Sequence, residues 1–273
     1  MAESSRRSDD ALTRAHALAA AALAEAPAGL LTDFDGTLSP IVADPATSRL
    51  VDGAAATLGS LARRLAVVAV VTGRAPLDAR RMTGVPGLLV AGNHGMEWLE
   101  PGAETPTPSP ETERVRRGIA GVLAAVPSLP GVTIEDKGLS ATIHYRNAAD
   151  PRGARERIVA ALPDLDPGGE LELRSGRMSL ELRPTGLGDK GAATEAIIAR
   201  FGLRGAVVMG DDVTDLDMFA AVAERRSAGR LRGVIIGVGG GDGETPASVA
   251  EAADVVLRDP AEAAVFLAGL VEA

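Results

Sequence analysis

Two aspartates, Asp33 and Asp35, follow an apolar run and precede a Gly-Thr pair in the segment 29–38, GLLTDFDGTL. Such a run is typical of a buried strand, and the glycine after it is typical of a turn. Open α/β sheets bind ligands at the carboxyl ends of their strands. Side chains two apart in an extended backbone point the same way, so both carboxylates can approach one reacting centre. A divalent cation would relieve their mutual repulsion.

Two other interpretations of this stretch are an Asp- and Gly-rich turn and a calcium loop. An EF-hand loop needs Gly at its sixth position and Glu at its twelfth. Counted from Asp33, Gly36 is the fourth residue and Asp44 is the twelfth, so the calcium loop is disfavoured. The turn interpretation stays open on this segment alone.

Three further polar positions follow apolar runs or begin helical segments: Thr72, Lys190 and the pair Asp211 and Asp215. Thr72 could be an ordinary turn residue, and the two aspartates could stabilise a helix N-terminus. A lysine in the first turn of a helix opposes the helix dipole, so Lys190 needs another reason to be there. We expect all four positions to meet at one edge of a sheet.

Phosphoryl transfer through an aspartyl-phosphate needs this set of groups. One carboxylate attacks phosphorus and a second acid protonates the departing alcohol. A hydroxyl and a lysine offset charge on the phosphoryl oxygens. Mg²⁺ suits such a site because it prefers hard oxygen ligands and retains bound waters.

Alternating apolar and amphipathic segments predict a parallel α/β sheet interrupted by an α+β insertion. Besides the first strand, the expected strands of the sheet lie at 65–71, 87–91, 205–210 and 233–238. A Pro-rich linker at 101–110 leads into the insertion, for which we expect helices at 111–126 and 152–162 and strands at 132–135, 140–145, 170–174 and 178–182. The expected domains are 1–102 and 187–273 for the α/β part and 103–186 for the insertion.

Composition restricts the class of partner. A net charge of −9 argues against nucleic-acid binding, and no apolar stretch is long enough to cross a membrane. The absence of cysteine excludes disulfides and thiolate chemistry. The Ala- and Leu-rich segment 10–26 is interrupted by charge, which favours an amphipathic helix over a secretion signal. We therefore expect a cytoplasmic monomer that acts on a small molecule.

Four segments are similar, in order, to the four motifs of the haloacid dehalogenase (HAD) superfamily of phosphatases: DFDGT at 33–37, VVTGR at 70–74, GDKG at 188–191 and GDDVTD at 210–215. More narrowly, the chain resembles the trehalose-6-phosphate phosphatases from about residue 30 to about residue 270. This resemblance includes GNHG at 92–95, EDK at 135–137, HYR at 144–146 and RP at 183–184.

The resemblance implies a Rossmann-like parallel-sheet HAD core with an inserted α+β cap domain, and an Mg²⁺-dependent sugar phosphatase. The implied catalytic residues are Asp33 as nucleophile, Asp35 as general acid and then base, and Thr72 and Lys190 as phosphate ligands. The implied metal ligands are Asp33, the main chain of Asp35 and Asp211, with Asp215 supporting the metal's water shell. The implied substrate-binding residues are Gly73, Arg74, Asn93 and His94 in the core and Glu135, Lys137, Arg177 and Glu181 in the cap.

The resemblance leaves the sugar open. Charged cap residues can equally form the solvated face of an antiparallel sheet, and His94 and His144 can be structural. The family usually has Lys where this chain has Arg177, and Glu where it has Leu216. Arg keeps the charge but changes the donor geometry. Alternative substrates are glucosyl or mannosyl phosphoglycerate, sucrose phosphate and an aminocyclitol pseudo-disaccharide phosphate; alternative classes are a phosphomutase and a non-catalytic sugar-phosphate sensor.

Overall fold

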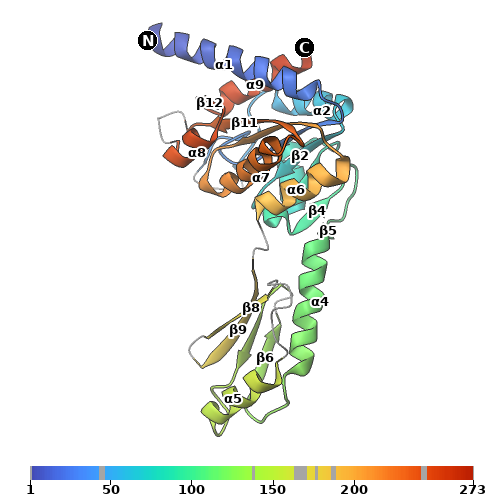
Figure 1. Cartoon of the computed structure of the whole chain (residues 1–273), viewed down its shortest axis with the longest axis vertical. Helices are drawn as coiled ribbons and strands as arrows, with labels where there is room; N and C mark the ends of the chain where they lie inside the picture. Colours follow the sequence, from blue (N-terminus) through green and yellow to red (C-terminus); the bar gives the residue numbers. More distant parts are fainter. Residues whose placement is uncertain are drawn as a thin grey trace. The chain divides into compact units, whose positions relative to one another are not determined.

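The computed structural model describes residues 2–42, 47–136, 139–162, 171–175, 178–185, 189–240 and 245–272 of the 273-residue chain. The chain divides into two compact units, Met1–Thr107 with Gly188–Ala273 and Pro108–Leu187. Figure 1 shows the elements of each unit.

An eight-stranded sheet forms the centre of the first unit. Its strands, in spatial order, are β12 (Val255–Leu257), β11 (Arg232–Val238), β10 (Gly205–Gly210), β1 (Ala28–Thr32), β2 (Val67–Val71), β3 (Leu89–Gly92), β4 (Glu97–Leu99) and β5 (Thr107–Pro108). Neighbouring strands from β12 to β3 are parallel, whereas β4 pairs antiparallel with β3. The predicted largely parallel sheet is confirmed.

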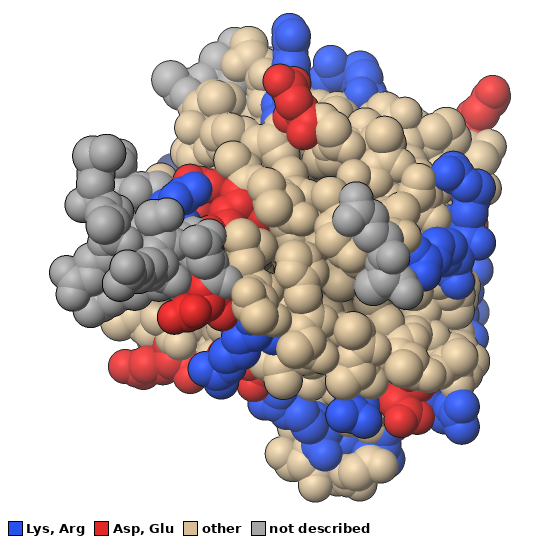
Figure 2. Space-filling model, turned by 90° about the horizontal axis from the view of Figure 1, so that it is seen from above, with Lys and Arg blue, Asp and Glu red and all other residues tan. Residues whose placement is uncertain are grey.

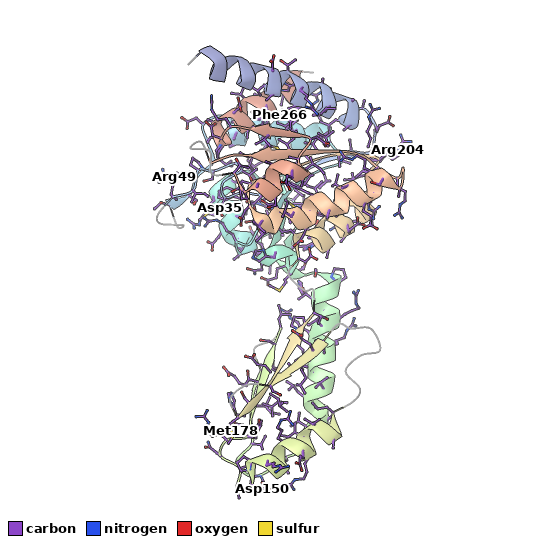
Figure 3. The ribbon with its side chains drawn as sticks, turned by 60° about the vertical axis from the view of Figure 1, so that its left-hand side comes forward. Asp35, Arg49, Asp150, Met178, Arg204 and Phe266 are labelled. Carbon is purple, nitrogen blue, oxygen red and sulfur yellow. The ribbon has the colours of Figure 1, made fainter. Side chains whose placement is uncertain are left out.

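Helices cover both faces of this sheet, which explains why its strands are apolar without alternation. One face packs against α1 (Ala2–Leu23), α2 (Ala54–Arg64) and α9 (Pro260–Glu272), and the other against α6 (Lys190–Phe201), α7 (Leu216–Ser227) and α8 (Ala247–Ala252). Within β1, Leu30 belongs to the first cluster and Leu31 to the second. Phe266 of α9 is fully buried in the first cluster (Figure 3). Helix α3 (Pro76–Thr83) packs against β3 and β4.

Strand β1 lies between β10 and β2, so the chain order reverses on its two sides. Connections leave such a switch point in opposite directions, and a crevice opens at the carboxyl ends of the strands. Asp33 follows β1, Thr72 follows β2 and Asp211 follows β10. The topology therefore places these three residues around one crevice.

The second unit is a four-stranded antiparallel sheet covered on one face by two helices. Its strands, in spatial order, are β6 (Thr133–Asp136), β7 (Ala141–His144), β9 (Ser179–Pro184) and β8 (Leu171–Ser175), and its helices are α4 (Pro110–Ala125) and α5 (Pro151–Ala161). Both helices have proline in the first turn and an N-cap, Ser109 or Asp150, that accepts a backbone N–H bond. These are strong helix-start signals, and the predicted bounds lie within one residue of the observed ones.

Three short strands were not predicted: β4, β5 and β12. Each has only two or three residues, too few for an alternation pattern. The stretch 101–110 was predicted to be a linker, but it contains β5 and the first residue of α4, so that prediction was wrong for its second half. Because β5 joins the large sheet, the second unit begins at Pro108, whereas the sequence placed the start of the insertion at 103.

Figure 2 shows one face of the molecule with basic and acidic side chains interspersed around its edge and uncharged residues across its middle. The chain as a whole carries a net charge of −9. Among the helices that the structure describes, none is long and apolar enough to cross a membrane.

Candidate active site

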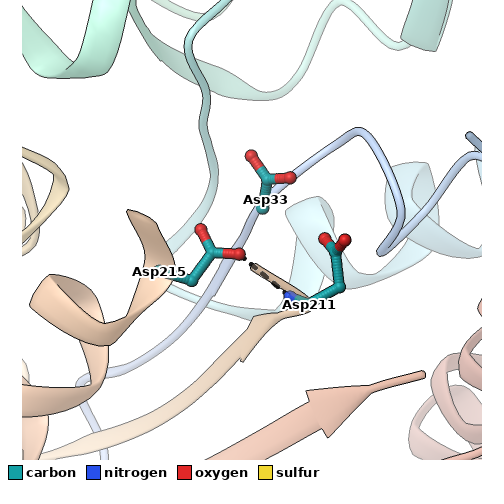
Figure 4. A group of neighbouring side chains, drawn as sticks. All are labelled: Asp33, Asp211 and Asp215. Carbon is teal, nitrogen blue, oxygen red and sulfur yellow. Dashed lines mark hydrogen bonds between the residues drawn. The ribbon is translucent and has the colours of Figure 1, made fainter. Parts of the chain in front are cut away.

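Three carboxylates converge at the switch point of the large sheet (Figure 4). They belong to Asp33, Asp211 and Asp215, and one oxygen of each lies within 4.8 Å of the others. The backbone N–H of Asp33 donates to the carbonyl of Met209 at 3.0 Å, which ties the end of β1 to β10. Asp215 ends the short 3-10 helix η3 (Val213–Asp215) and is fully buried. The loops after two adjacent strands thus supply one acidic cluster.

Lys190 joins two of these carboxylates. Its Nζ donates to Oδ1 of Asp33 at 2.7 Å and to Oδ1 of Asp215 at 2.6 Å, and its side chain is only 4% exposed. Lys190 is the first residue of α6, after the N-cap Asp189. The helix dipole and burial both oppose a cation there, so the two carboxylates explain its position, as the sequence suggested.

Asp215 also organises the loop. Its Oδ2 accepts the backbone N–H groups of Asp211 and Asp212 at 2.9 and 3.1 Å. Asp215 thus caps the short helix η3 as well as pairing with Lys190, but its side chain makes no cap bond to α7. Because Asp215 bonds both to Lys190 and to the backbone that follows β10, it fixes Lys190 relative to the end of that strand.

The cluster contains more negative charge than Lys190 can neutralise. Burial, with the nearby Asp215 and Asp211, raises the pKa of Asp33 to about 8 although Lys190 opposes the shift. Burial also raises the pKa of Asp211 to about 7. Burial disfavours the Lys190 ammonium, but Asp33 and Asp215 outweigh it and raise the pKa of Lys190. Once all three carboxylates are ionised, the single ammonium leaves two negative charges, and a hard divalent cation such as Mg²⁺ fits this oxygen donor set.

Two residues of the DFDGT segment hold Asp211 in place. The hydroxyl of Thr37 donates to Oδ1 of Asp211 at 2.8 Å, and Gly36 lies against the same carboxylate. A Cβ atom at Gly36 would lie 1.9 Å from Oδ2 of Asp211. The sequence motifs assigned no role to Thr37, although a hydroxyl two residues after Asp35 is a recognisable signal.

Gly36→Ala is expected to lower the free energy of unfolding by about 2–4 kcal/mol, because it adds a clash to a strained backbone. Gly36 has a φ of +81°, and Gly53 is a matched control with a φ of +83° and no atom within 4 Å of its Cβ position. Gly53→Ala carries the backbone strain alone, about 1 kcal/mol. Urea denaturation of both variants checks this, and equal losses would show that Asp211 is not packed against Gly36.

A cavity of about 580 Å³ opens beside the cluster. The sequence-predicted residues that line it are Asp33, Asp35, Thr72, Gly73, Arg74, His94, Lys190 and Asp211. Two exposed apolar residues, Ile41 and Val42, also line it. Asn93 is not among the lining residues, and its side-chain amide donates to the carboxylate of Glu97. The structure thus brings the four motif segments to one cavity.

Asp35 lines the same cavity for a different reason from the one the sequence suggested. Strand β1 ends at Thr32, the chain bends at Phe34, and Asp35 directly precedes the turn at 36–38, so an extended backbone does not align Asp33 with Asp35. Figure 3 shows Asp35 at this edge of the sheet. Its carboxylate pairs with Arg74. The carboxylate of Asp35 is therefore not part of the acidic cluster of Asp33, Asp211 and Asp215.

Thr72 and His94 fix the second side of the cavity. Thr72 is buried, and its hydroxyl accepts the backbone N–H of Arg74 at 3.2 Å, which is a turn role. The backbone N–H of His94 donates to the carbonyl of Thr72 at 2.9 Å. His94 has a φ of +57°, and its ring lies over Gly73, where a Cβ atom would come within 2.8 Å of it. Burial lowers the pKa of His94, which favours its neutral form.

In the second unit, Glu135 and Glu181 lie on the polar face of the sheet. Thr142 pairs with Glu135 on one side and with Glu181 on the other, so the three form a row across β6, β7 and β9. The side chain of His144 lies 3.5 Å from the carboxylate of Glu135. The two other predicted cap residues, Lys137 and Arg177, lie outside the described residues.

Comparison with known proteins decides the family. A model of the trehalose-phosphatase family matches residues 31–252, which include all four motif segments. The chain belongs to this family. It is 37% identical over 248 residues to the trehalose-phosphate phosphatase of Mycobacterium avium, covering 88% of this chain and 61% of that protein. It is also 37% identical over 200 residues to a Mycobacterium tuberculosis protein named an uncharacterized glycosyl hydrolase, covering 70% of this chain and 15% of that protein. The chain spans less than two thirds of the length of these curated relatives.

Solved structures of the family have the same fold. One crystal form of Aspergillus fumigatus trehalose-6-phosphate phosphatase superposes with a TM-score of 0.59 at 26% identity, covering 94% of this chain and 97% of that one. A second crystal form gives a TM-score of 0.60 at 24% identity. The predicted fold class, a HAD core with a largely parallel sheet and an α+β insertion, is confirmed.

Proposed function

We propose that this protein is an Mg²⁺-dependent phosphatase that hydrolyses trehalose 6-phosphate to trehalose and phosphate through an aspartyl-phosphate on Asp33. The observation that carries the proposal is the buried cluster in which Lys190 holds Asp33 at the open end of the sheet. Membership of the trehalose-phosphatase family supports the reaction class, and similarity to trehalose-phosphate phosphatases supports the substrate.

Two carboxylates of this chain perform the bond changes. Lys190 engages Oδ1 of Asp33, and Oδ2 is the oxygen that we assign to the attack on phosphorus. The bond from phosphorus to the sugar oxygen breaks as Asp35 gives that oxygen a proton. Asp35 then takes a proton from the water that attacks the aspartyl-phosphate. Release of phosphate restores the carboxylate of Asp33.

The remaining residues bind and orient the phosphoryl group. We assign the Thr72 hydroxyl, Gly73 and the Lys190 ammonium to its oxygens, since all three line the cavity. Asp33, Asp211 and the main chain of Asp35 would hold Mg²⁺, with Asp215 supporting its water shell. When bound, Mg²⁺ supplies positive charge that favours phosphoryl transfer between anionic groups.

We assign the sugar to His94, which lines the cavity. Asn93 stays a prediction of the resemblance, because its amide is bonded to Glu97 and it does not line the cavity. In the second unit, the resemblance implies that the polar sheet face contacts the sugar. On that face, Glu135 and Glu181 offer carboxylate acceptors to sugar hydroxyls. Lys137 and Arg177 would add donors. The monomeric state and the cytoplasmic location rest on the sequence alone and stay predictions.

A substrate panel tests the proposed function. Phosphate release with Mg²⁺ is measured for trehalose 6-phosphate, glucosyl phosphoglycerate, mannosyl phosphoglycerate, sucrose phosphate and an aminocyclitol pseudo-disaccharide phosphate. A clear preference of kcat/KM for trehalose 6-phosphate is expected. Slow turnover of the whole panel without preference would contradict the substrate, and an isomeric sugar phosphate without free phosphate would indicate a mutase. Binding without turnover would indicate a sensor.

Mg²⁺ is expected to stabilise the protein more at alkaline than at acidic pH. Asp33 and Asp211 have folded-state pKa values of about 8 and about 7 without metal, above the usual value for Asp. In the absence of metal, the raised pKa values of Asp33 and Asp211 contribute stability to the folded state. This contribution is fully present below about pH 4 and is lost as the pH rises through 7 to 8. Mg²⁺ requires the ionised forms, so saturating metal should raise Tm by about 5 °C near pH 8.5 and by about 1 °C near pH 5. Thermal unfolding with Mg²⁺ or with a chelator measures both shifts, and equal shifts would contradict metal binding at these carboxylates.

A further inference from the structure

The guanidinium of Arg74 donates hydrogen bonds to both oxygens of the Asp35 carboxylate. Nε donates to Oδ2 and Nη2 donates to Oδ1, each at 2.6 Å. Ser48 bonds to both residues. Nη2 of Arg74 donates to the Ser48 hydroxyl at 2.8 Å, and that hydroxyl donates to Oδ1 of Asp35 at 3.2 Å. A bidentate Arg–carboxylate pair fixes the direction of the carboxylate as well as its position.

Arg74 is itself held firmly. Its guanidinium carbon lies 5.5 Å from the ring centroid of Phe34, the buried residue between the two acids of the first motif. Its backbone N–H donates to the hydroxyl of Thr72, and its carbonyl accepts the backbone N–H of Asn93 at 2.8 Å. The side chain is 15% exposed, against 37% for Asp35. The guanidinium is thus the less exposed partner of the pair, and we take it as the group that orients the carboxylate of Asp35.

These contacts separate the two acids of the motif. Lys190 orients Asp33, and Arg74 with Ser48 orients Asp35. A ligand of the transferred phosphoryl group would be expected to point at Asp33, yet the described donor bonds of the Arg74 side chain go to Asp35 and Ser48. Proton transfer in turn requires that the carboxyl group be held within hydrogen-bond reach of the reacting oxygen.

We propose that Arg74, supported by Ser48, is the positioning residue that aims Asp35 for proton transfer, an inference that rests on the proposed phosphatase function. Arg74 keeps all its protons throughout. When Asp35 carries a proton, one of its oxygens keeps its bond from the guanidinium and the other exchanges that bond for the proton. The protonated oxygen gives its proton to the departing oxygen and later takes one from water. This role replaces the substrate contact that the sequence suggested for Arg74.

Two aryl phosphates that lack a sugar test the proposal. Phenyl phosphate has a poor leaving group that needs the acid, whereas p-nitrophenyl phosphate has a good one that does not. Arg74→Ala is expected to lower kcat/KM about 100-fold for phenyl phosphate and less than about 5-fold for p-nitrophenyl phosphate. Ser48→Ala should show the same selectivity with a loss of about 3- to 10-fold on phenyl phosphate.

Controls make the outcome unambiguous. Arg81→Ala removes an exposed arginine of α3 that pairs with Asp78, and both rates should stay within about 2-fold. Arg74→Lys keeps the charge without the fork and should fall between Arg74→Ala and the wild type. Circular dichroism and Tm identify variants that fail to fold, in which case Ser48→Ala and Arg74→Lys decide.

Equal losses on both substrates would show that Arg74 contacts the phosphoryl group, and unchanged rates on both would confine it to the sugar. Either result would overturn the proposal. Asp35→Asn tests the underlying assignment separately, since it should give the same selective loss as Arg74→Ala. If Asp35→Asn is not selective, or if the wild type releases no phosphate from any substrate, the proposed function fails and the role of Arg74 fails with it.

Discussion

Asp33→Asn is expected to lower phosphate release by about 10⁴-fold or more while the protein stays folded. Asn preserves the shape of the side chain, but its amide is not a nucleophile and cannot form an acyl phosphate. The neighbouring carboxylates that the structure describes are already held, that of Asp35 by Arg74, that of Asp211 by Thr37, and that of Asp215 by Lys190 and two backbone N–H groups. Phosphate release from trehalose 6-phosphate measures the loss.

The same variant has an expected effect on stability. The pKa of Asp33 is raised to about 8 by burial and by its acidic neighbours, so without metal its charge destabilises the folded state increasingly as the pH approaches 8. Asn removes that charge and should raise the free energy of unfolding near pH 8.5 by about 1 kcal/mol or more in a chelator, with little change near pH 4.

Asp78→Asn is the matched control, because Asp78 is an exposed aspartate of α3 that pairs with Arg81. It should leave both activity and stability nearly unchanged. An Asp33→Asn protein with activity close to that of wild type would exclude Asp33 as the nucleophile. A folded and inactive variant that is less stable near pH 8.5 would instead show that the charge of Asp33 is compensated in the absence of metal.

The arrangement of strands and motif loops could be predicted because it depends on local signals. Buried parallel strands are continuous apolar runs, and polar residues directly after them must lie at the edge of the sheet. Lys190 was singled out because a cation in the first turn of a helix opposes the helix dipole. The structure shows the two carboxylates that compensate for this position. Local consistency and its exceptions are both visible in a sequence.

The partners of Asp35 could not be predicted in the same way. Ser48 is 13 residues away in the sequence and Arg74 is 39 residues away, and no periodicity connects residues in loops. The turn after Asp35 depends on the positive φ of Gly36. Glycine can adopt several backbone conformations, so the sequence alone does not predict this one. The residues of the site follow from the motifs, whereas the hydrogen bonds between them require the fold.

Lys190→Met is expected to destabilise the protein by about 3–5 kcal/mol near pH 8, because it leaves buried carboxylates without their ammonium partner. Met fills a similar volume, so the loss of stability comes mainly from the lost charge and not from a cavity. The two pairings of Lys190 raise its pKa, so its ammonium stays charged until strongly alkaline pH, and at lower pH the cost depends on the protonation of the carboxylates around it. Phosphate release should fall about 10³-fold, as expected for loss of a charged phosphate ligand.

The cost should depend on pH and on burial. Near pH 5, Asp33 and Asp211 bind protons because their pKa values are about 8 and about 7, so the variant should lose less stability than near pH 8. Arg200→Met on the same helix is the matched control, since Arg200 pairs with Glu100 but its side chain is 46% exposed. Screening by water should keep that loss near 1 kcal/mol at both pH values. Urea denaturation of the two variants at both pH values compares a buried with an exposed ion pair on one helix, and equal losses would mean that water reaches the carboxylates around Lys190.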